Sequence, residues 1–188
     1  MALILTSVPL AGVLGIAFSS MFVGGNWVVT YANVPVLMLP SSTSSADKAQ
    51  KPEASPSHLA RQWQMTYDIG SKAGPFLAVS SCVSYLYAAR ELPSAAVTQK
   101  RLFVAAAVLS MAIVPFTFTV MKRTNGELHR RALAATQGKE EEAKADAEKD
   151  GVESYQTNEL LRWWSTLNIL RASIHVGAIS CGIAAMLL

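Results

Sequence analysis

Long stretches without charged side chains are the feature that most limits how this chain can fold. No Asp, Glu, Lys or Arg occurs in the first 46 residues, and residues 73–89, 102–121 and 172–188 contain none either. A helix needs about 17 to 25 predominantly apolar residues to cross the hydrocarbon core of a bilayer. Each uncharged stretch reaches that length, so the sequence predicts helices that span a membrane.

The overall composition and the pattern of the third stretch favour the same interpretation. Charged residues make up 15% of the chain, whereas soluble domains carry about 25%. A soluble four-helix bundle is the competing fold, but its helices would show a polar outer face every 3.6 residues. Residues 102–115 have no such face. A cleaved signal peptide is also disfavoured, because no basic segment precedes the first apolar run, which continues past Val29.

We therefore predict one all-α membrane domain, residues 1–188, built as a four-transmembrane-helix bundle with up-down topology. The predicted spans are at about 7–31, 71–90, 102–121 and 164–187. Two polar stretches, 41–57 and 137–153, are predicted to be flexible loops, since they lack the apolar residues needed to order a chain. The expected location is an integral, multi-pass position in a membrane such as the endoplasmic reticulum or a vesicle.

Polar side chains share one face of the last predicted span. Trp164, Asn168, Arg171 and His175 are spaced by four, three and four residues, which places them on one stripe of a helix. An ionisable residue inside an apolar helix is costly to bury and by default marks a functional cavity. Arg171 lies too deep for an ordinary end charge, although its long side chain could still reach the interface.

The other predicted spans also carry polar or small-residue faces. Two asparagines facing lipid would leave their amides unpaired, so the face of the first span should turn inward. The four faces could then enclose one cavity. Structural roles are the alternative, because Asn and Ser also join membrane helices and Trp and Tyr also mark the interface. The candidate binding residues on these faces are Asn26, Trp63, Tyr67, Phe116, Thr117, Asn125 and Trp164.

The sequence contains no motif for a bound cofactor or a metal ion. Cys82 and Cys181 each stand alone within a predicted span, and only His175 of the three histidines falls at membrane depth. These residues do not form a zinc ligand set. A glycine-rich phosphate loop and a serine-nucleophile elbow are absent as well, and the basic residues do not form a nucleic-acid surface. We expect no organic redox cofactor, no metal ion and no nucleic-acid partner.

Three runs of the chain resemble one known family. Leu59–Pro75, Pro115–Leu128 and Trp164–Arg171 are similar to the anthrone oxygenases, small four-span proteins once described as a domain of unknown function. The likeness covers nearly the whole chain except its two polar stretches. The sequence from Pro115 to Asn125 and the later Trp, Asn and Arg carry it best.

The resemblance implies an oxygenase that converts a polyketide anthrone to an anthraquinone with dioxygen, without flavin, haem or nicotinamide. The partners would be a small hydrophobic aromatic substrate, dioxygen and the lipid bilayer. The methylene hydrogens of an anthrone are acidic because the resulting anion is aromatic, and that anion can pass an electron to dioxygen. Such an enzyme needs a base, a partner for the developing oxyanion and a dry cavity.

Residues can be matched to these needs. Arg171 and Asn168 are expected to stabilise the oxyanion. His175 is expected to be the general base, with Asp68 or Tyr67 in reserve. The rings of the substrate would stack on aromatic side chains. The candidates for stacking are Trp63, Trp164 and Phe116.

Two other classes of function fit the same sequence. One is a non-catalytic four-span adaptor or assembly protein, whose polar stripes would bind partner helices. The other is a small transporter in which Arg171 binds an anionic solute, although four spans without broken-helix repeats make this less favoured. The sequence does not indicate which oligomeric state the protein has.

Overall fold

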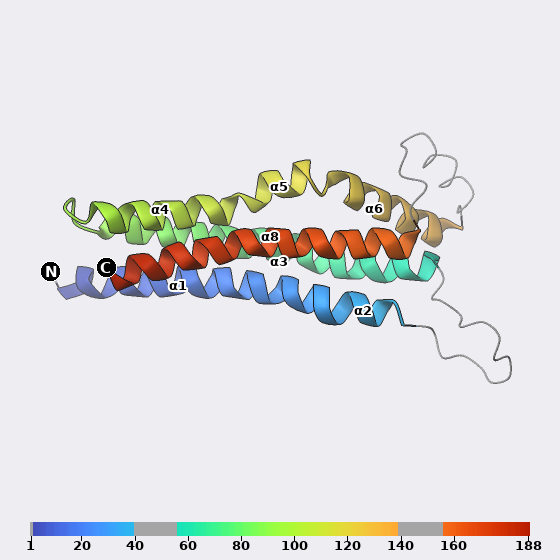
Figure 1. The fold of residues 1–188 in the computed structure, drawn as a ribbon, viewed down its shortest axis with the longest axis horizontal. Coiled ribbons are helices and arrows are strands. Elements are labelled where there is room, and N and C mark those ends of the chain that lie inside the picture. Colours follow the sequence, from blue (N-terminus) through green and yellow to red (C-terminus); the bar gives the residue numbers. More distant parts are fainter. Residues whose placement is uncertain (1, 40–55, 139–155) are drawn as a thin grey trace. The chain divides into compact units, whose positions relative to one another are not determined.

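The structure is a computed structural model that describes residues 2–39, 56–138 and 156–188. Every regular element in these ranges is a helix, which confirms the all-α prediction for them. The predicted loops at 41–57 and 137–153 fall outside the described residues except at their edges. The elements are α1 (Ala2–Val28), the π-helical turn η1 (Val29–Asn33), α2 (Val34–Leu37), α3 (Pro56–Glu91), α4 (Val97–Met111), α5 (Ile113–Thr119), α6 (Lys122–Gln137) and α8 (Thr157–Leu187) (Figure 1).

Among the described residues, three helical stretches are long and apolar enough to cross a membrane: Val8–Leu37, Val97–Thr119 and Thr157–Leu187. The chain is therefore built as an integral membrane protein. The predicted second span, 71–90, lies within α3, which is not apolar enough by the same measure. Serine, tyrosine, glycine and proline residues dilute its apolar side chains. A total of four spans stays a prediction.

The third predicted span, 102–121, overlaps the apolar stretch Val97–Thr119, which is divided into two helical segments, α4 and α5. α4 ends at Met111, four residues before Pro115, because proline has no N–H to donate to the Met111 carbonyl. α5 then begins at Ile113. The hydroxyl of Thr117 donates to the Ile113 carbonyl at 2.8 Å and that of Thr119 to the Pro115 carbonyl at 2.7 Å.

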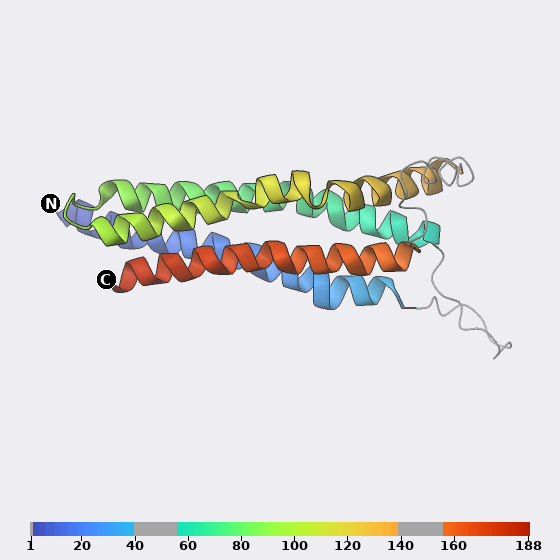
Figure 2. The ribbon, with the colours of Figure 1, turned by 45° about the horizontal axis from the view of Figure 1, so that its top comes forward.

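The helices form two compact units. The first unit contains Met1–Trp27, Ser71–Thr119 and Asn168–Leu188, and the second contains Val28–Gly70 and Val120–Leu167. Within the first unit, a short turn joins α3 to α4, and the Ala96 N–H donates to the Pro93 carbonyl at 3.0 Å. The N- and C-terminal ends of the chain lie at the same end of this unit as the turn in both views, so successive segments alternate in direction (Figures 1 and 2).

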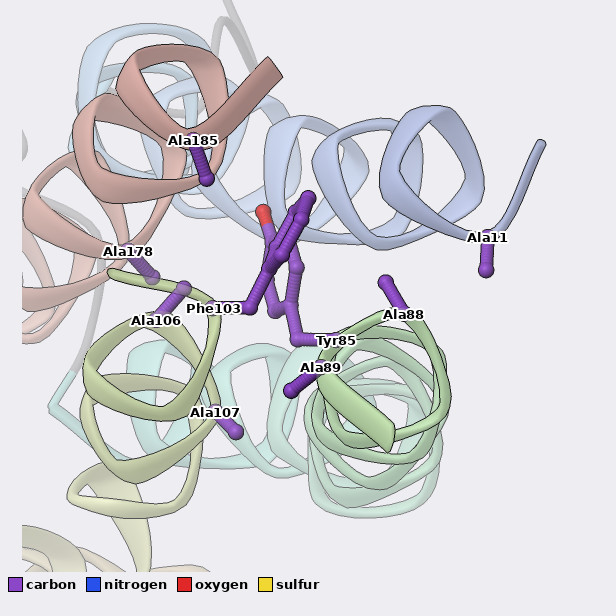
Figure 3. Packing of buried hydrophobic residues seen from close by; sticks show 9 residues of the cluster. All are labelled: Ala11, Tyr85, Ala88, Ala89, Phe103, Ala106, Ala107, Ala178 and Ala185. Carbon is purple, nitrogen blue, oxygen red and sulfur yellow. The ribbon is translucent and has the colours of Figure 1, made fainter. Parts of the chain in front are cut away.

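Small residues let the helices of the first unit approach closely. Figure 3 shows the rings of Tyr85 and Phe103 surrounded by alanines that come from α1, α3, α4 and α8. The two ring centroids are 6.2 Å apart. In a membrane, where lipid is as apolar as the side chains, such close packing is the main force that holds helices together. The buried alanines of this cluster are Ala11, Ala88, Ala89, Ala106, Ala107, Ala178 and Ala185.

The Tyr85 ring is held between two glycines of neighbouring helices. A Cβ atom on Gly15 would lie 2.6 Å from the ring, and one on Gly182 would lie 2.8 Å from it. The Tyr85 hydroxyl donates to Ser19 at 3.4 Å, and Ser19 donates to Ser81 at 3.1 Å. The ring is thus fixed at its faces and at its hydroxyl, and it cannot move away from an added methyl group.

We expect Gly15→Ala to lower the stability of the protein by roughly 1–3 kcal/mol, because overpacking a filled core forces side chains and backbone to shift. Thermal unfolding in detergent measures the change. Gly24→Ala is the matched control on the same helix, since a Cβ there meets nothing within 4 Å. An equal Tm for the two variants would contradict the close packing of Gly15 against the Tyr85 ring.

Candidate functional site

A cluster around Arg171 joins α8 to α1 in the first unit. The Nη2 atom of Arg171 donates to the Oδ1 atom of Asn26 at 2.8 Å and to the Oδ1 atom of Asn168 at 2.9 Å. Asn26 in turn donates from Nδ2 to the Phe22 carbonyl at 2.8 Å, which fixes the orientation of its amide. Both asparagines are buried. One guanidinium nitrogen therefore bridges two helices through neutral amide oxygens.

Aromatic rings complete the Arg171 cluster. The guanidinium carbon lies 5.4 Å from the centroid of the Phe22 ring, within the range of a cation–π contact. His175, one turn further along α8, stacks on the same ring with a centroid distance of 4.0 Å and is fully buried. The backbone of Ser110, on α4, is a polar neighbour of the imidazole.

The first unit is poor in negative charge. Its sequence ranges contain one acidic residue, Glu91, which is the last residue of α3. The side chains that accept these two hydrogen bonds from Arg171 are neutral amides, which orient the cation through their oxygen dipoles. A cation held by dipoles in apolar surroundings attracts an anion more strongly than it would in water. The cluster therefore has the chemistry of a site for developing negative charge.

Four sequence-predicted residues thus meet in the first unit: Asn26, Asn168, Arg171 and His175. Two more, Phe116 and Thr117, lie on α5 of the same unit and are half-buried. The Thr117 hydroxyl is bonded within its own helix. The remaining predicted residues, Trp63, Tyr67, Asn125 and Trp164, belong to the second unit.

A second cluster, built from aromatic rings, lies in the second unit. Trp63 on α3 is fully buried, and its ring centroid is 5.0 Å from that of Tyr67, one turn away. The Trp164 ring meets the Trp63 ring edge to face at 5.9 Å. His129, on α6, meets Tyr67 at 4.4 Å and Trp63 at 5.0 Å, again edge to face. We call Trp63, Tyr67, His129 and Trp164 the aromatic cluster.

A chain of hydrogen bonds orients the imidazole of this cluster. The Nε2 atom of Gln64 donates to the Asp68 carboxylate at 2.7 Å, and the Oε1 atom of Gln64 lies 2.6 Å from the Nδ1 atom of His129. Asp68, one of the two reserve bases, is exposed. Burial lowers the pKa of His129 below its ordinary value, and the negative charge of Asp68 opposes this effect in part.

Several polar atoms of the second unit are buried without a hydrogen-bond partner among the described residues. They include the indole Nε1 of Trp63, the Oδ1 of Asn125 and the Oε1 of Gln62. Buried polar atoms of native proteins are nearly always paired, and each exception calls for a structural or functional reason. Asn125 lies one turn before His129 on α6, so both residues face α3 with the same side of their helix.

An ion-pair network anchors α6 in the second unit. The Glu127 carboxylate is buried and accepts hydrogen bonds from Arg130 and, at 2.6 Å, from Arg131. Arg131 also donates to the Thr157 hydroxyl, at the start of α8, at 2.9 Å. α6 and α8 are therefore tied together through one buried carboxylate.

Sequence reasoning did not identify His129 or Gln64. His129 stands beside two arginines outside the predicted spans, and its partner lies 65 residues away on another helix. The spacing of Gln64 and Asp68 by four residues was the available signal, but such pairs are common on exposed helix faces.

For metal ions, the described residues contain no group of three or more His, Cys, Asp or Glu side chains placed to hold one.

Comparison with known proteins links the chain to one enzyme family. The family model for anthrone oxygenase matches residues 63–181. Monooxygenase hypC of Dothistroma septosporum is 31% identical over 118 residues, covering 62% of this chain and 57% of the relative. Anthrone oxygenase ptaC of Pestalotiopsis fici is 33% identical over 119 residues, covering 63% and 78%.

A third relative, anthrone oxygenase nsrD of Aspergillus novofumigatus, is 40% identical over 83 residues, covering 43% of this chain and 51% of the relative. The matched region of this chain thus spans only between half and three fifths of the length of hypC and nsrD. No solved structure matches the chain.

Proposed function

This chain belongs to the anthrone oxygenase family, and from that premise we propose that it oxidises a polyketide anthrone to the corresponding anthraquinone with dioxygen. The observation that carries the proposal is the Arg171 cluster, a cation held by amide oxygens in an apolar unit with one acidic residue. A substrate that becomes an anion during the reaction matches this site.

We propose that the C-terminal half of α3 is the fourth span of the bundle. Residues 73–89 carry no charge, and Tyr85 packs in the core of the first unit together with residues of the three apolar stretches. An intramembrane site would admit a flat, poorly soluble substrate directly from the bilayer. It would also favour dioxygen, which dissolves better in hydrocarbon than in water.

The proposed role of Arg171 is electrostatic. When the anthrone loses a methylene proton, negative charge collects on the carbonyl oxygen at the opposite side of the middle ring. A preorganised cation and its amide partner stabilise such charge without reorganising at the moment of reaction. Asn26 and Asn168 keep Arg171 in place, and Asn168 is predicted to act on the oxyanion beside it.

The proposed base is His175, with Phe22 as the ring that positions it. The base removes one methylene proton, and the resulting anion passes one electron to dioxygen to give a carbon radical and superoxide. These combine to a peroxide anion, which takes the proton back from the base. The hydroperoxide then loses water, with the remaining hydrogen of that carbon, to form the quinone carbonyl. One anthrone and one dioxygen give one quinone and one water.

Turnover by the purified protein tests this proposal. We expect the full chain, in lipid nanodiscs and in air, to form an anthraquinone faster than the same nanodiscs without protein, and to consume one dioxygen per quinone. The rate should be unchanged by a metal chelator. Quinone absorbance and an oxygen electrode give the two quantities. An adaptor or transporter would leave the background rate of autoxidation unchanged, and that result would refute the proposal.

A further inference from the structure

We propose that the Arg171 cluster lies at one boundary of the bilayer, at the depth where the hydrocarbon core meets the phospholipid headgroups, and that the first unit fills the core between its two boundaries. The inference concerns the depth of the site and goes beyond the proposed reaction. It depends on three features of the first unit: where its charged residues lie, which residues its helices bring to the same depth, and how long the uncharged segments are.

Charged residues stand at the ends of the first unit. Four of them flank the turn between α3 and α4 (Figure 1). The other two are on α3 and α8, away from this turn. Lysine and arginine at such positions hold their charged groups among the headgroups while their carbon chains stay in the apolar layer. The charged residues of the unit are Lys72, Arg90, Glu91, Lys100, Arg101 and Arg171.

Contacts within the first unit place Lys72 and Arg171 at the same end. Arg171 donates to Asn26 on α1, and its guanidinium carbon lies 5.4 Å from the centroid of the Phe22 ring. A Cβ atom on Gly74, two residues after Lys72 on α3, would lie 3.5 Å from the same ring. Lys72 is exposed and Arg171 is half-buried. The two cations therefore mark one boundary of the unit.

The other boundary is marked at the turn between α3 and α4. Gln99, in the first turn of α4, donates from its side chain to the Ala185 carbonyl on α8 at 3.2 Å. Ala185 also belongs to the same buried cluster as Ala88, which lies two residues before Arg90 (Figure 3). The last turns of α8 thus reach the depth of the charged residues at the turn, and α8 runs from one charged boundary, at Arg171, to the other.

The uncharged segments between these boundaries match the thickness of the hydrocarbon core. Residues 73–89 lie between Lys72 and Arg90 on α3, and residues 172–188 follow Arg171 on α8. At about 1.5 Å per residue, each segment is about 25 Å long. The core of a typical bilayer is roughly 30 Å thick. Arg171 therefore stands at the edge of the uncharged layer, where holding a cation costs less than at the bilayer centre.

The length of α8 allows a second placement, which the charges disfavour. The apolar stretch Thr157–Leu187 has 31 residues, so it is about 46 Å long and exceeds the core. A core centred on this whole stretch would have its middle near Ala172 and would hold Arg171 at the bilayer centre. A core centred on Asn168–Leu188, the part of α8 in the first unit, has its middle near Ala178.

Depth measurements along the exposed face of α8 separate the two placements. In the full chain, Cys82 and Cys181 are first replaced by alanine, so that a nitroxide reacts with one introduced cysteine only. Each labelled protein is placed in lipid nanodiscs. Collisions of the nitroxide with dioxygen, which concentrates in the core, and with a water-soluble nickel chelate report its depth. The labelled positions, all exposed, are Leu170, Val176, Ser180 and Leu187.

We expect the labels at Val176 and Ser180 to be the deepest and about equally deep. The labels at Leu170 and Leu187 should both be about 10 Å shallower, since each lies two to three turns from the middle of the segment. In the other placement, the label at Leu170 would be the deepest of the four, and depth would decrease steadily towards Leu187. That profile would refute the proposal, and so would four labels of equal depth.

Two labels on α3 repeat the test on a second helix. Ala73 and Val83 are exposed, and they lie near the start and the middle of the uncharged segment 73–89. The Ala73 label should be as shallow as the Leu170 label, and the Val83 label as deep as the Val176 label. Access of the nickel chelate to Val83 would contradict the proposal, because α3 would then not cross the core.

Thermal unfolding shows whether each labelled protein is folded. If the cysteine-free protein does not fold, the nitroxide is attached through a ketone side chain introduced at the same positions, and both natural cysteines stay in place. The depth measurements need no substrate. Their outcome is therefore independent of whether the protein oxidises an anthrone, and the failure of one proposal leaves the other standing.

Discussion

Replacing Arg171 with alanine is expected to lower kcat/KM for anthrone oxidation by about 10²- to 10³-fold, the usual effect of removing one preorganised oxyanion partner. The methyl group that remains can neither donate to the amide oxygens of Asn26 and Asn168 nor offset negative charge on the substrate. Arg171→Lys should give a kcat/KM between those of the natural protein and Arg171→Ala, because lysine keeps the positive charge but replaces the planar guanidinium, whose Nη2 atom bonds both asparagines, with a compact ammonium group. The rate of quinone formation in nanodiscs is measured for the natural protein and for the two Arg171 variants.

Two controls make the Arg171 result specific. Arg162→Ala removes an exposed arginine from the same helix and should leave kcat/KM within a factor of two of the natural value. Thermal unfolding and recovery in the membrane fraction show whether Arg171→Ala is folded. A folded Arg171→Ala protein with natural activity would remove the central element of the proposed mechanism.

The helical fold could be predicted from the sequence because membrane helices satisfy their backbone within one segment. Uncharged stretches of sufficient length therefore indicated the helices directly. Helix α3 is a less direct case, because serines and Pro75 lower its apolar content although Tyr85 packs in the core. The interruption between α4 and α5 follows from Pro115, which removes one hydrogen bond without shortening the apolar run.

The site was predictable within one helix and less so between helices. The helical period places Asn168, Arg171 and His175 on one face of α8, and they share a face in the structure. That Asn26 would bond Arg171 depends on the rotation of α1 and α8 about their axes, which no single-helix pattern determines. The helical period also places Trp164 on the polar stripe of α8, but its ring packs against Trp63 in the second unit.

His129 shows the same limit more clearly. Its neighbours in the sequence are Arg130 and Arg131, so the local pattern indicates an exposed basic helix. Its contacts are with Gln64 and the rings on α3, and only the packing of α6 against α3 brings these side chains together. A titratable residue outside the apolar stretches can thus belong to a hydrogen-bonded cluster between two helices.

Glu127→Ala is expected to destabilise the second unit by roughly 2 kcal/mol. Its carboxylate side chain is only 2% exposed, whereas Arg130 and Arg131 keep 25% and 20% of their side-chain surface. Removing one partner of a fully buried ion pair costs about 3–5 kcal/mol, and the solvent that still reaches both arginines reduces that value. For a chain of this size the loss corresponds to a fall in Tm of about 4–8 °C. Thermal unfolding in detergent measures it.

The reason for so large an effect lies in the position of Glu127 on α6. Its carboxylate orients Arg131, and Arg131 donates to Thr157 where α8 begins, so one side chain supports the contact between two helices. Glu159→Gln is the matched control, because Glu159 is exposed on α8 and an amide oxygen can still accept from the Gln156 N–H. The control should change Tm by no more than about 2 °C. An equally small change in Glu127→Ala would mean that α6 is held by its apolar face alone, through buried residues such as Leu128.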